Sequence, residues 1–221
     1  MGRVTEICAL LEREYGRPDT KPRYGPLDEF ILTILSQNTS AVNYTRAYAN
    51  LRERFGDWEA VRVAPVADIE DAIRPGGLAK TKAPRIKQAL NDILERTGDL
   101  SLDFLADMPD AEAREYLMQF DGVGIKTASC VLMFSLKRPV LPVDTHVHRL
   151  SQRLGLIGRN ESAESAHHLL QAMVPDDLVY SFHVNLVTHG RRVCKAQNPA
   201  CDACALLPIC PHGQSVLAGG A

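Results

Sequence analysis

The sequence lacks any apolar stretch that approaches the roughly 20 residues needed to cross a lipid bilayer. Residues 1–11 include Arg3 and Glu6, where a secretory signal would be apolar. Internal repeats and low-complexity tracts are also absent. We therefore expect a cytoplasmic protein that does not bind membranes.

Segments typical of β-strands are nearly absent as well. The best candidate, Val140 to Val143, contains Pro142, and proline disrupts the hydrogen bonding of a strand. Apolar residues instead recur at helical spacing, and Gly and Pro divide the chain into segments of about one to two dozen residues. The residues with helical spacing are Leu27, Phe30, Ile31, Ile34 and Leu35; Ile86, Ala89, Leu90, Ile93 and Leu94; and Leu169, Leu170, Met173 and Val174. This pattern predicts an all-α fold.

The sequence has no excess of positive charge. Its 25 Lys and Arg residues are balanced by 27 Asp and Glu residues, for a formal net charge of −2 over 221 residues. A nucleic-acid site would therefore have to be a local basic patch. Each of two basic clusters, taken alone, is more typical of a solvated helix face or loop. They are Lys80, Lys82, Arg85 and Lys87, and Arg191, Arg192 and Lys195.

What the sequence does have is a dense group of cysteines near its C-terminal end. Four cysteines follow the spacing C-x6-C-x2-C-x5-C, and they are Cys194, Cys201, Cys204 and Cys210. Thiolates on a short irregular loop suit soft metals, so the residues alone allow an iron–sulfur cluster or a structural zinc. Four cysteines leave no open coordination position, so we expect a structural or electronic role. Cys8 and Cys130 lie in apolar helical patterns and should be buried thiols.

A glycine pair separates two predicted helices, over residues 111–120 and 125–136. The connection is Asp121-Gly122-Val123-Gly124. Glycine tolerates positive φ and lets another backbone approach, so the amides of this turn could bind a phosphate oxygen without recognising a base sequence. A plain helix–helix corner is the alternative.

Two residues near this turn suit chemistry. Lys126 falls in the first turn of the second helix, where the positive end of the helix dipole favours a neutral amine. A neutral amine can attack carbon and form a Schiff base, whereas a protonated one could only bind phosphate. Asp144 precedes an apolar-patterned segment, so the simplest role for it is a helix N-cap, with a catalytic role as the alternative.

Together these motifs resemble the endonuclease III family of DNA glycosylases, which contain a helix-hairpin-helix. The resemblance covers nearly the whole chain. Its most specific part is the cysteine spacing, which matches the family's 4Fe–4S loop and so favours iron–sulfur over zinc. The matching segments are 35–39, 77–78, 122–128, 143–146, 189–191 and the four cysteines.

The resemblance implies a two-domain all-α protein that binds damaged double-stranded DNA as a monomer and associates with the nucleoid. Residues 24–138 would form a six-helix barrel that includes the hairpin. Residues 1–23 and 139–221 would form the cluster domain, with the four cysteines binding a 4Fe–4S cluster. The residues implied in DNA binding are Gln37, Asn38, Leu78, Gly122, Gly124, Lys126, Thr127, His146 and Arg191.

The family also implies a chemistry, with Lys126 as the amine that attacks C1′ of the deoxyribose and Asp144 as the carboxylate that assists proton transfer. The protein would be a base excision repair glycosylase and lyase that releases oxidised pyrimidines such as thymine glycol and nicks the strand by β-elimination. Two alternatives remain: a monofunctional mismatch or uracil-type glycosylase, and a catalytically silent iron–sulfur protein that binds DNA. Lys126 argues against the first, and Lys126 with Asp144 argues against the second.

Three positions depart from the family pattern. Asp121 replaces the usual proline of the hairpin, and we expect its carboxylate to weaken phosphate binding. Ala79 follows Leu78 where a tyrosine is frequent. The segment 37–40 also differs from the commonest bacterial form, which leaves open whether Gln37 or Asn38 would enter the duplex.

Overall fold

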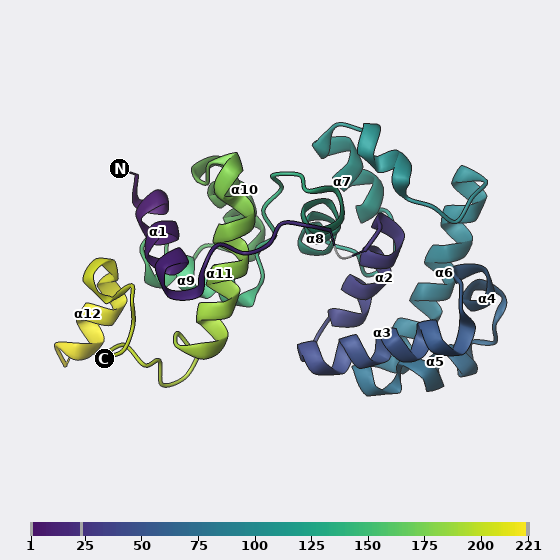
Figure 1. Ribbon diagram of the computed structural model, residues 1–221, viewed down its shortest axis with the longest axis horizontal. Helices are drawn as coiled ribbons and strands as arrows, with labels where there is room; N and C mark the ends of the chain where they lie inside the picture. The colour runs from purple at the N-terminus through teal and green to yellow at the C-terminus, as the bar shows by residue number, and fades with distance from the viewer. Residues whose placement is uncertain (1, 23, 220–221) are drawn as a thin grey trace. The chain divides into compact units, whose positions relative to one another are not determined.

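The computed structural model describes residues 2–22 and 24–219. Within these ranges the protein is helical without a β-strand, as Figure 1 shows, and the all-α prediction is confirmed. None of the helices described is long and apolar enough to span a membrane. The chain divides into two compact units: Pro22–Arg138, and a second that joins the segment ending at Lys21 to the segment beginning at Pro139.

The unit Pro22–Arg138 contains an apolar helix, α8, whose residues Thr127 to Met133 are all buried. Helix α2 packs against α8 and also contacts α3 and α6. Helix α7 packs against α8 as well. The helices of this unit are α2 (Pro26–Ser36), α3 (Ala41–Phe55), α4 (Trp58–Val63), α5 (Val66–Ile73), α6 (Ala79–Thr97), α7 (Asp110–Met118) and α8 (Ile125–Leu136), with 3-10 turns η1 (Arg74–Gly76) and η2 (Asp103–Asp107).

Helix α2 illustrates how the sequence sets these elements. Pro26 occupies its first position and acidic residues follow in the first turn, both of which favour a helix N-terminus. The apolar residues at helical spacing are all buried, as predicted: Leu27, Phe30, Ile31, Ile34 and Leu35. Phe30 also meets Phe120 in a T-shaped contact with ring centroids 5.2 Å apart. This contact fixes the residue that leads into the glycine turn.

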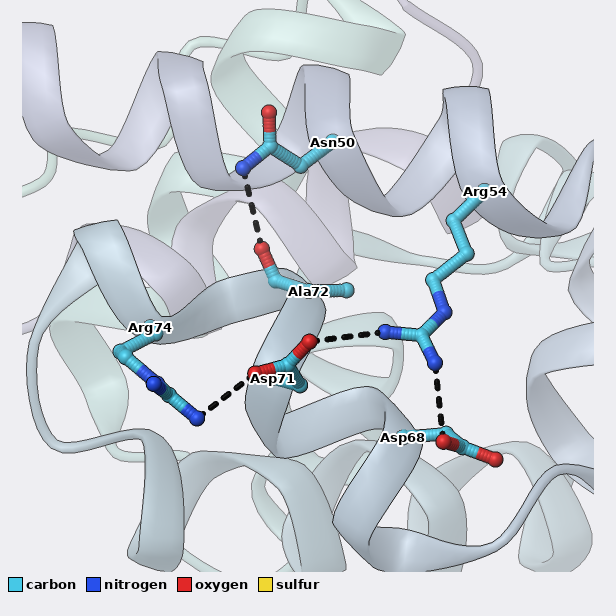
Figure 2. A network of polar contacts seen from close by, with 6 residues as sticks. All are labelled: Asn50, Arg54, Asp68, Asp71, Ala72 and Arg74. Atoms are coloured by element: carbon cyan, nitrogen blue, oxygen red, sulfur yellow. Dashed lines mark hydrogen bonds and ion pairs between the residues drawn. The ribbon is translucent and has the colours of Figure 1, made fainter.

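A polar network joins α3 to α5 and η1 (Figure 2). Its members are Asn50 and Arg54 of α3, Asp68, Asp71 and Ala72 of α5, and Arg74 of η1. Arg54 binds Asp68 at 2.8 Å and Asp71 at 3.1 Å, and Asp71 also binds Arg74 at 2.6 Å. Exposed ion pairs each contribute about 1 kcal/mol or less. The network therefore orients α5 on α3, and η1 on α5, more than it stabilises the unit.

The second unit brings the N-terminal helix onto the C-terminal segment. Helix α11 packs against α1 and α9, and Asn185 donates to the carbonyl of Gly16 at 3.3 Å. Arg3 donates to the carbonyls of Leu154 and Ile209, at 2.6 and 2.9 Å. The helices of this unit are α1 (Arg3–Tyr15), α9 (Thr145–Arg153), α10 (Ala163–Met173), α11 (Val179–Arg192) and α12 (Pro211–Leu217), with η3 (Asp176–Leu178) and η4 (Leu207–Ile209).

Two sequence predictions about buried residues have different outcomes. Cys8 and Cys130 are buried thiols, as expected. The apolar face predicted for α10 is partly wrong, because Leu169 and Met173 are 36% and 44% exposed. The buried face of α10 includes the polar residue His167, whose Nε2 accepts from the amide of Val143 at 3.0 Å. A pattern based on apolar residues cannot identify such a position.

Candidate active site

The glycine turn connects α7 to α8 in the unit Pro22–Arg138. Gly122 has φ +73, a conformation that favours glycine, and Val123 is buried with its amide bonded to the carbonyl of Phe120 at 3.1 Å. Gly124 occupies the N-cap of α8, so the cap residue makes no side-chain hydrogen bond to that helix terminus. The first amides of a helix have no partner within it, and they carry the positive end of the dipole. The turn therefore offers an anion-binding backbone.

Arg85 of α6 lies against this turn. Its Nε donates to Asp121 Oδ2 at 2.8 Å, and its guanidinium is so close that a Cβ on Gly122 would lie 2.8 Å from Nη1. The side chain of Asp121 is 72% exposed and that of Arg85 is 32% exposed. The carboxylate that replaces the family's proline is thus paired with a cation. We therefore no longer expect the full repulsion of phosphate that an isolated carboxylate would cause.

Lys126 is the second residue of α8 and is half-buried. Thr127, the next residue, is buried, and its Oγ1 accepts a long hydrogen bond of 3.4 Å from Gln37 Nε2. The same amide nitrogen of Gln37 donates to the carbonyl of Gly122 at 2.9 Å. Gln37 therefore braces the turn beside Lys126. Its two hydrogen bonds join the segment after α2 to the turn and to the start of α8.

Two exposed residues lie on neighbouring connections of this unit. Asn38 is exposed with φ +53, and Leu78 is 53% exposed with φ +52. Non-glycine residues with positive φ are uncommon. An exposed leucine in this conformation is therefore a feature that the surrounding structure has to hold in place.

The predicted basic cluster on α6 does not form one solvated face. Lys82 is only 2% exposed, and its Nζ donates to the carbonyls of Leu35 and Gly76. Arg85 is paired with Asp121, and Lys87 donates to the carbonyl of Ala64. The prediction of a surface cluster is therefore wrong for Lys82, because backbone carbonyls from distant segments supply its partners.

Asp144 caps α9 in the second unit. Its Oδ1 accepts from the amides of His146 at 2.9 Å and Val147 at 2.8 Å, which confirms the predicted N-cap. Both bonds end on the same oxygen atom. The second carboxylate oxygen, Oδ2, takes part in neither cap bond.

His146 packs tightly against α11. A Cβ on Gly190 would lie 2.7 Å from His146 Nδ1, so only glycine allows this approach. Arg149 Nη2 lies 3.0 Å from the same ring nitrogen. Burial lowers the pKa of His146, and Arg149 and Arg191 act in the same direction while Asp144 opposes them. Arg191 is exposed, so it is the more accessible cation of this group.

The four cysteines of the C-terminal loop lie close enough to influence one another. Burial raises the pKa of Cys204, and the charges of Cys194, Cys210 and Cys201 raise it further. Three of the sulfur atoms have N–H groups within hydrogen-bonding distance. Cys194 Sγ accepts from Arg153 Nη1 at 3.2 Å, and Cys210 Sγ accepts from the amide of Gly213 at 3.4 Å.

The third contact involves a buried histidine. His189 Nε2 lies 3.3 Å from Cys204 Sγ, and its Nδ1 lies 2.8 Å from the hydroxyl of Tyr15. Burial lowers the pKa of His189 to about 4, so the ring is neutral at physiological pH. In the tautomer that has its proton on Nε2, the ring accepts from Tyr15 at Nδ1 and donates to the sulfur from Nε2.

These donor contacts fit thiolates that carry negative charge. Over residues 2–22 and 24–219, no group of three or more His, Cys, Asp or Glu side chains is arranged to hold a single metal ion.

Sequence reasoning missed several residues of these sites. Lys82, Arg85 and Arg153 bind atoms far away in the sequence, and nothing in their local pattern indicates it. Arg149 and Arg153 are four residues apart on α9 and both bond to the cysteine loop, Arg149 through the carbonyl of Cys194. That helical spacing of two arginines was the one available signal.

Comparison with known proteins identifies the family. Residues 31–176 match the HhH-GPD superfamily base excision DNA repair protein family. Endonuclease III of Thermotoga maritima is 36% identical over 207 residues, which cover 94% of this chain and 92% of that protein. A candidate DNA glycosylase of Arabidopsis thaliana is 40% identical over 75% of this chain, which spans 56% of that protein.

A solved structure matches over nearly the whole fold. It is a trapped covalent intermediate of endonuclease III with DNA, in an estranged-adenine complex, and it superposes with a TM-score of 0.83 at 26% identity. The match covers 98% of this chain and 100% of that one. The chain therefore belongs to the HhH-GPD superfamily of base excision DNA repair proteins.

Proposed function

We propose that this protein is a DNA glycosylase with lyase activity at abasic sites, acting on damaged double-stranded DNA. The observation that carries the proposal is the position of Lys126, in the first turn of α8 directly behind the glycine turn. The similarity of this chain to endonuclease III supports the same conclusion, since one related structure is a covalent enzyme–DNA intermediate.

The amine of Lys126 is the nucleophile. The N-terminus of α8 disfavours a cation, which promotes the neutral amine that nucleophilic attack requires. The glycine turn would bind a phosphate of the damaged strand through its backbone amides. The glycine turn and the nucleophile Lys126 thus belong to one rigid segment, which holds the amine at a defined distance from the sugar.

The reaction proceeds in two steps. The lone pair of the Lys126 amine attacks C1′, the glycosidic bond breaks, and the damaged base leaves with the bonding electrons and gains a proton. Loss of a proton from nitrogen and opening of the sugar ring give a Schiff base. Removal of a proton from C2′ then expels the 3′ phosphate by β-elimination, which nicks the strand. No redox change is involved.

Asp144 serves as the proton-transfer group. Its Oδ1 is occupied by the two cap bonds, so Oδ2 accepts or returns protons while the cap holds the carboxylate in one orientation. The negative charge also stabilises positive charge that develops on the sugar. His146 and Arg191 would bind phosphates from the same unit.

The base is recognised after it leaves the duplex. Flipping is easier for a base that already pairs or stacks poorly, which favours oxidised pyrimidines such as thymine glycol as substrates. Asn38 and Leu78 would fill the gap in the duplex. Gln37 is already bonded to the turn, so we assign it to bracing and assign insertion to Asn38.

The cysteine loop would bind a 4Fe–4S cluster through Cys194, Cys201, Cys204 and Cys210. The spacing of the four thiols and the N–H donors at three of their sulfurs support this assignment. When bound, the cluster would supply a cross-link that orders the loop and the end of α11. Replacing Cys204 with alanine should reduce the visible iron–sulfur absorbance and weaken DNA binding. Full absorbance with normal binding would overturn the ligand assignment.

The lyase proposal is tested by strand cleavage on duplexes that carry thymine glycol or an abasic site. Wild type should release the thymine glycol base and should cut both duplexes. The cleavage rate of Lys126→Ala should fall by about a thousandfold or more while the variant keeps its fold. Lys137→Ala is the matched control, because Lys137 ends the same helix at its other terminus. Base release by wild type without cleavage would instead establish a monofunctional glycosylase. Binding without either reaction would establish a silent DNA-binding protein.

A further inference from the structure

A buried lysine connects the two segments that lead to Asn38 and Leu78. Lys82 of α6 is 2% exposed, and its Nζ donates to the carbonyl of Leu35 at 2.7 Å and to that of Gly76 at 3.1 Å. Leu35 lies in the last turn of α2, and Gly76 is the last residue of η1. One ammonium group therefore joins the element that precedes each loop.

Core packing alone does not explain a lysine at this position. Burying an ammonium group is unfavourable, and burial lowers the pKa of Lys82. Its two acceptors are neutral carbonyls, so no full charge offsets the loss of water. The carbonyls at the end of α2 lack partners within the helix and favour a cation. An apolar residue would fill the same space but would leave both carbonyls without this donor.

Both loops hold an unusual backbone conformation. Asn38 and Leu78 have positive φ values of 53 and 52, which persist in non-glycine residues only when the surroundings hold them. The segment that leads to Leu78 is closely packed, because a Cβ on Gly76 would lie 2.9 Å from Cβ of Ala47 on α3. In the polar network of Figure 2, Arg74 of η1 binds Asp71 of α5, which in turn binds Arg54 of α3. Lys82 then ties this assembly to the end of α2.

We propose that Lys82 is a positioning residue that holds the Asn38 loop and the Leu78 loop at a fixed spacing, so that both side chains enter the duplex together. This inference deepens the proposed function and rests on it. Apolar side chains that enter between base pairs unstack them at a cost of a few kcal/mol. Because both loops are already ordered in the free protein, binding does not also have to supply the free energy of ordering them.

The test uses a duplex with a tetrahydrofuran analogue of an abasic site opposite 2-aminopurine. This analogue cannot form a Schiff base, so the result does not depend on catalysis. With saturating protein that contains its cluster, wild type should raise the 2-aminopurine fluorescence, and Leu78→Ala should lose most of the rise. Lys82→Met should lose more than half of it, and Lys82→Arg, which keeps the charge and the donors, should restore it.

Lys87→Met is the matched control, because Lys87 lies on the same helix and also donates to a carbonyl, that of Ala64. It should leave the rise unchanged. A purely structural role for Lys82 would lower the melting temperature without changing fluorescence at saturation. A full rise with folded Lys82→Met, or an equal loss with Lys87→Met, would overturn the inference.

A second variant keeps the inference testable if Lys82→Met does not fold. Gly76→Ala retains the lysine but displaces η1 from Ala47, and so moves one of its two acceptors. The fluorescence rise should fall, and a full rise in this folded variant would refute the coupling. Failure of the proposed function has a different signature: wild type would unstack the analogue duplex normally but would not cleave a natural abasic site.

Discussion

Replacing Gly122 with alanine should affect both stability and DNA binding, for two separable reasons. The residue has φ +73, and an L-residue in this conformation costs about 1–2 kcal/mol, partly offset by the reduced entropy of the unfolded chain. The new Cβ would also meet Arg85 Nη1 at 2.8 Å, so the guanidinium has to move away from Asp121. Loss of this partly exposed ion pair adds about 0.2–1 kcal/mol.

Gly98→Ala separates the two effects. Gly98 has φ +76, lies in the same unit, and has no atom within 4 Å of an added Cβ, so its variant carries the conformational cost alone. We expect Gly98→Ala to lower the free energy of unfolding by about 1 kcal/mol, and Gly122→Ala to lower it by up to about 1 kcal/mol more. In an Arg85→Ala background, Gly122→Ala and Gly98→Ala should lower the free energy of unfolding by the same amount.

DNA binding gives the second signature. Once Arg85 is displaced, the carboxylate of Asp121 is unpaired beside the turn amides that are proposed to bind phosphate. A like charge at about 4 Å in water costs about 1 kcal/mol, so affinity for an abasic-analogue duplex should fall about fivefold in Gly122→Ala only. Urea unfolding and fluorescence titration measure the two quantities. Equal unfolding free energies for Gly122→Ala and Gly98→Ala, with unchanged affinity, would refute the role assigned to Arg85.

Three further predictions concern single side chains. Asp144→Asn keeps an oxygen that can accept the cap bonds, so it should unfold within about 0.5 kcal/mol of wild type yet lose at least about a hundredfold in cleavage rate. Asp144→Ala should in addition lose about 1 kcal/mol of stability in urea unfolding. Tyr48→Phe removes the hydroxyl that donates to Asp28, and the unfolding free energy should fall by about 1–2 kcal/mol. Burial raises the pKa of Cys8 to about 12, so its thiolate is about one part in ten thousand at pH 8, and peptide mapping should find it alkylated only after unfolding.

Local sequence was sufficient where the deciding contacts are local. The bounds of α8 follow from Gly124 at its N-cap and from the apolar run behind it, and Asp144 caps α9 because its carboxylate meets amides two and three residues later. The apolar spacing of α2 likewise located its buried face. In each case the partners lie within one or two turns of the chain.

Distant contacts were not predictable in the same way. A lysine is expected at the surface, whereas Lys82 is buried and donates hydrogen bonds to the carbonyls of Gly76 and of Leu35, which is 47 residues away. The same holds for Arg85, whose partner Asp121 is 36 residues away. Sequence alone suggested a repulsive Asp121, whereas the structure shows it paired. Such pairs depend on tertiary packing, which the helical periodicity does not encode.

The amine of Lys126 is proposed to form the bond to the sugar, and mapping the modified residue is the direct test of this assignment. The protein would be reacted with an abasic-site duplex, reduced with borohydride, digested with a protease and nuclease, and analysed by mass spectrometry. If Lys126 is the nucleophile, the deoxyribose adduct should lie on the peptide that contains Lys126 and on no other lysine. An adduct at Lys137, Lys80 or the N-terminal amine, with Lys126 unmodified, would contradict it.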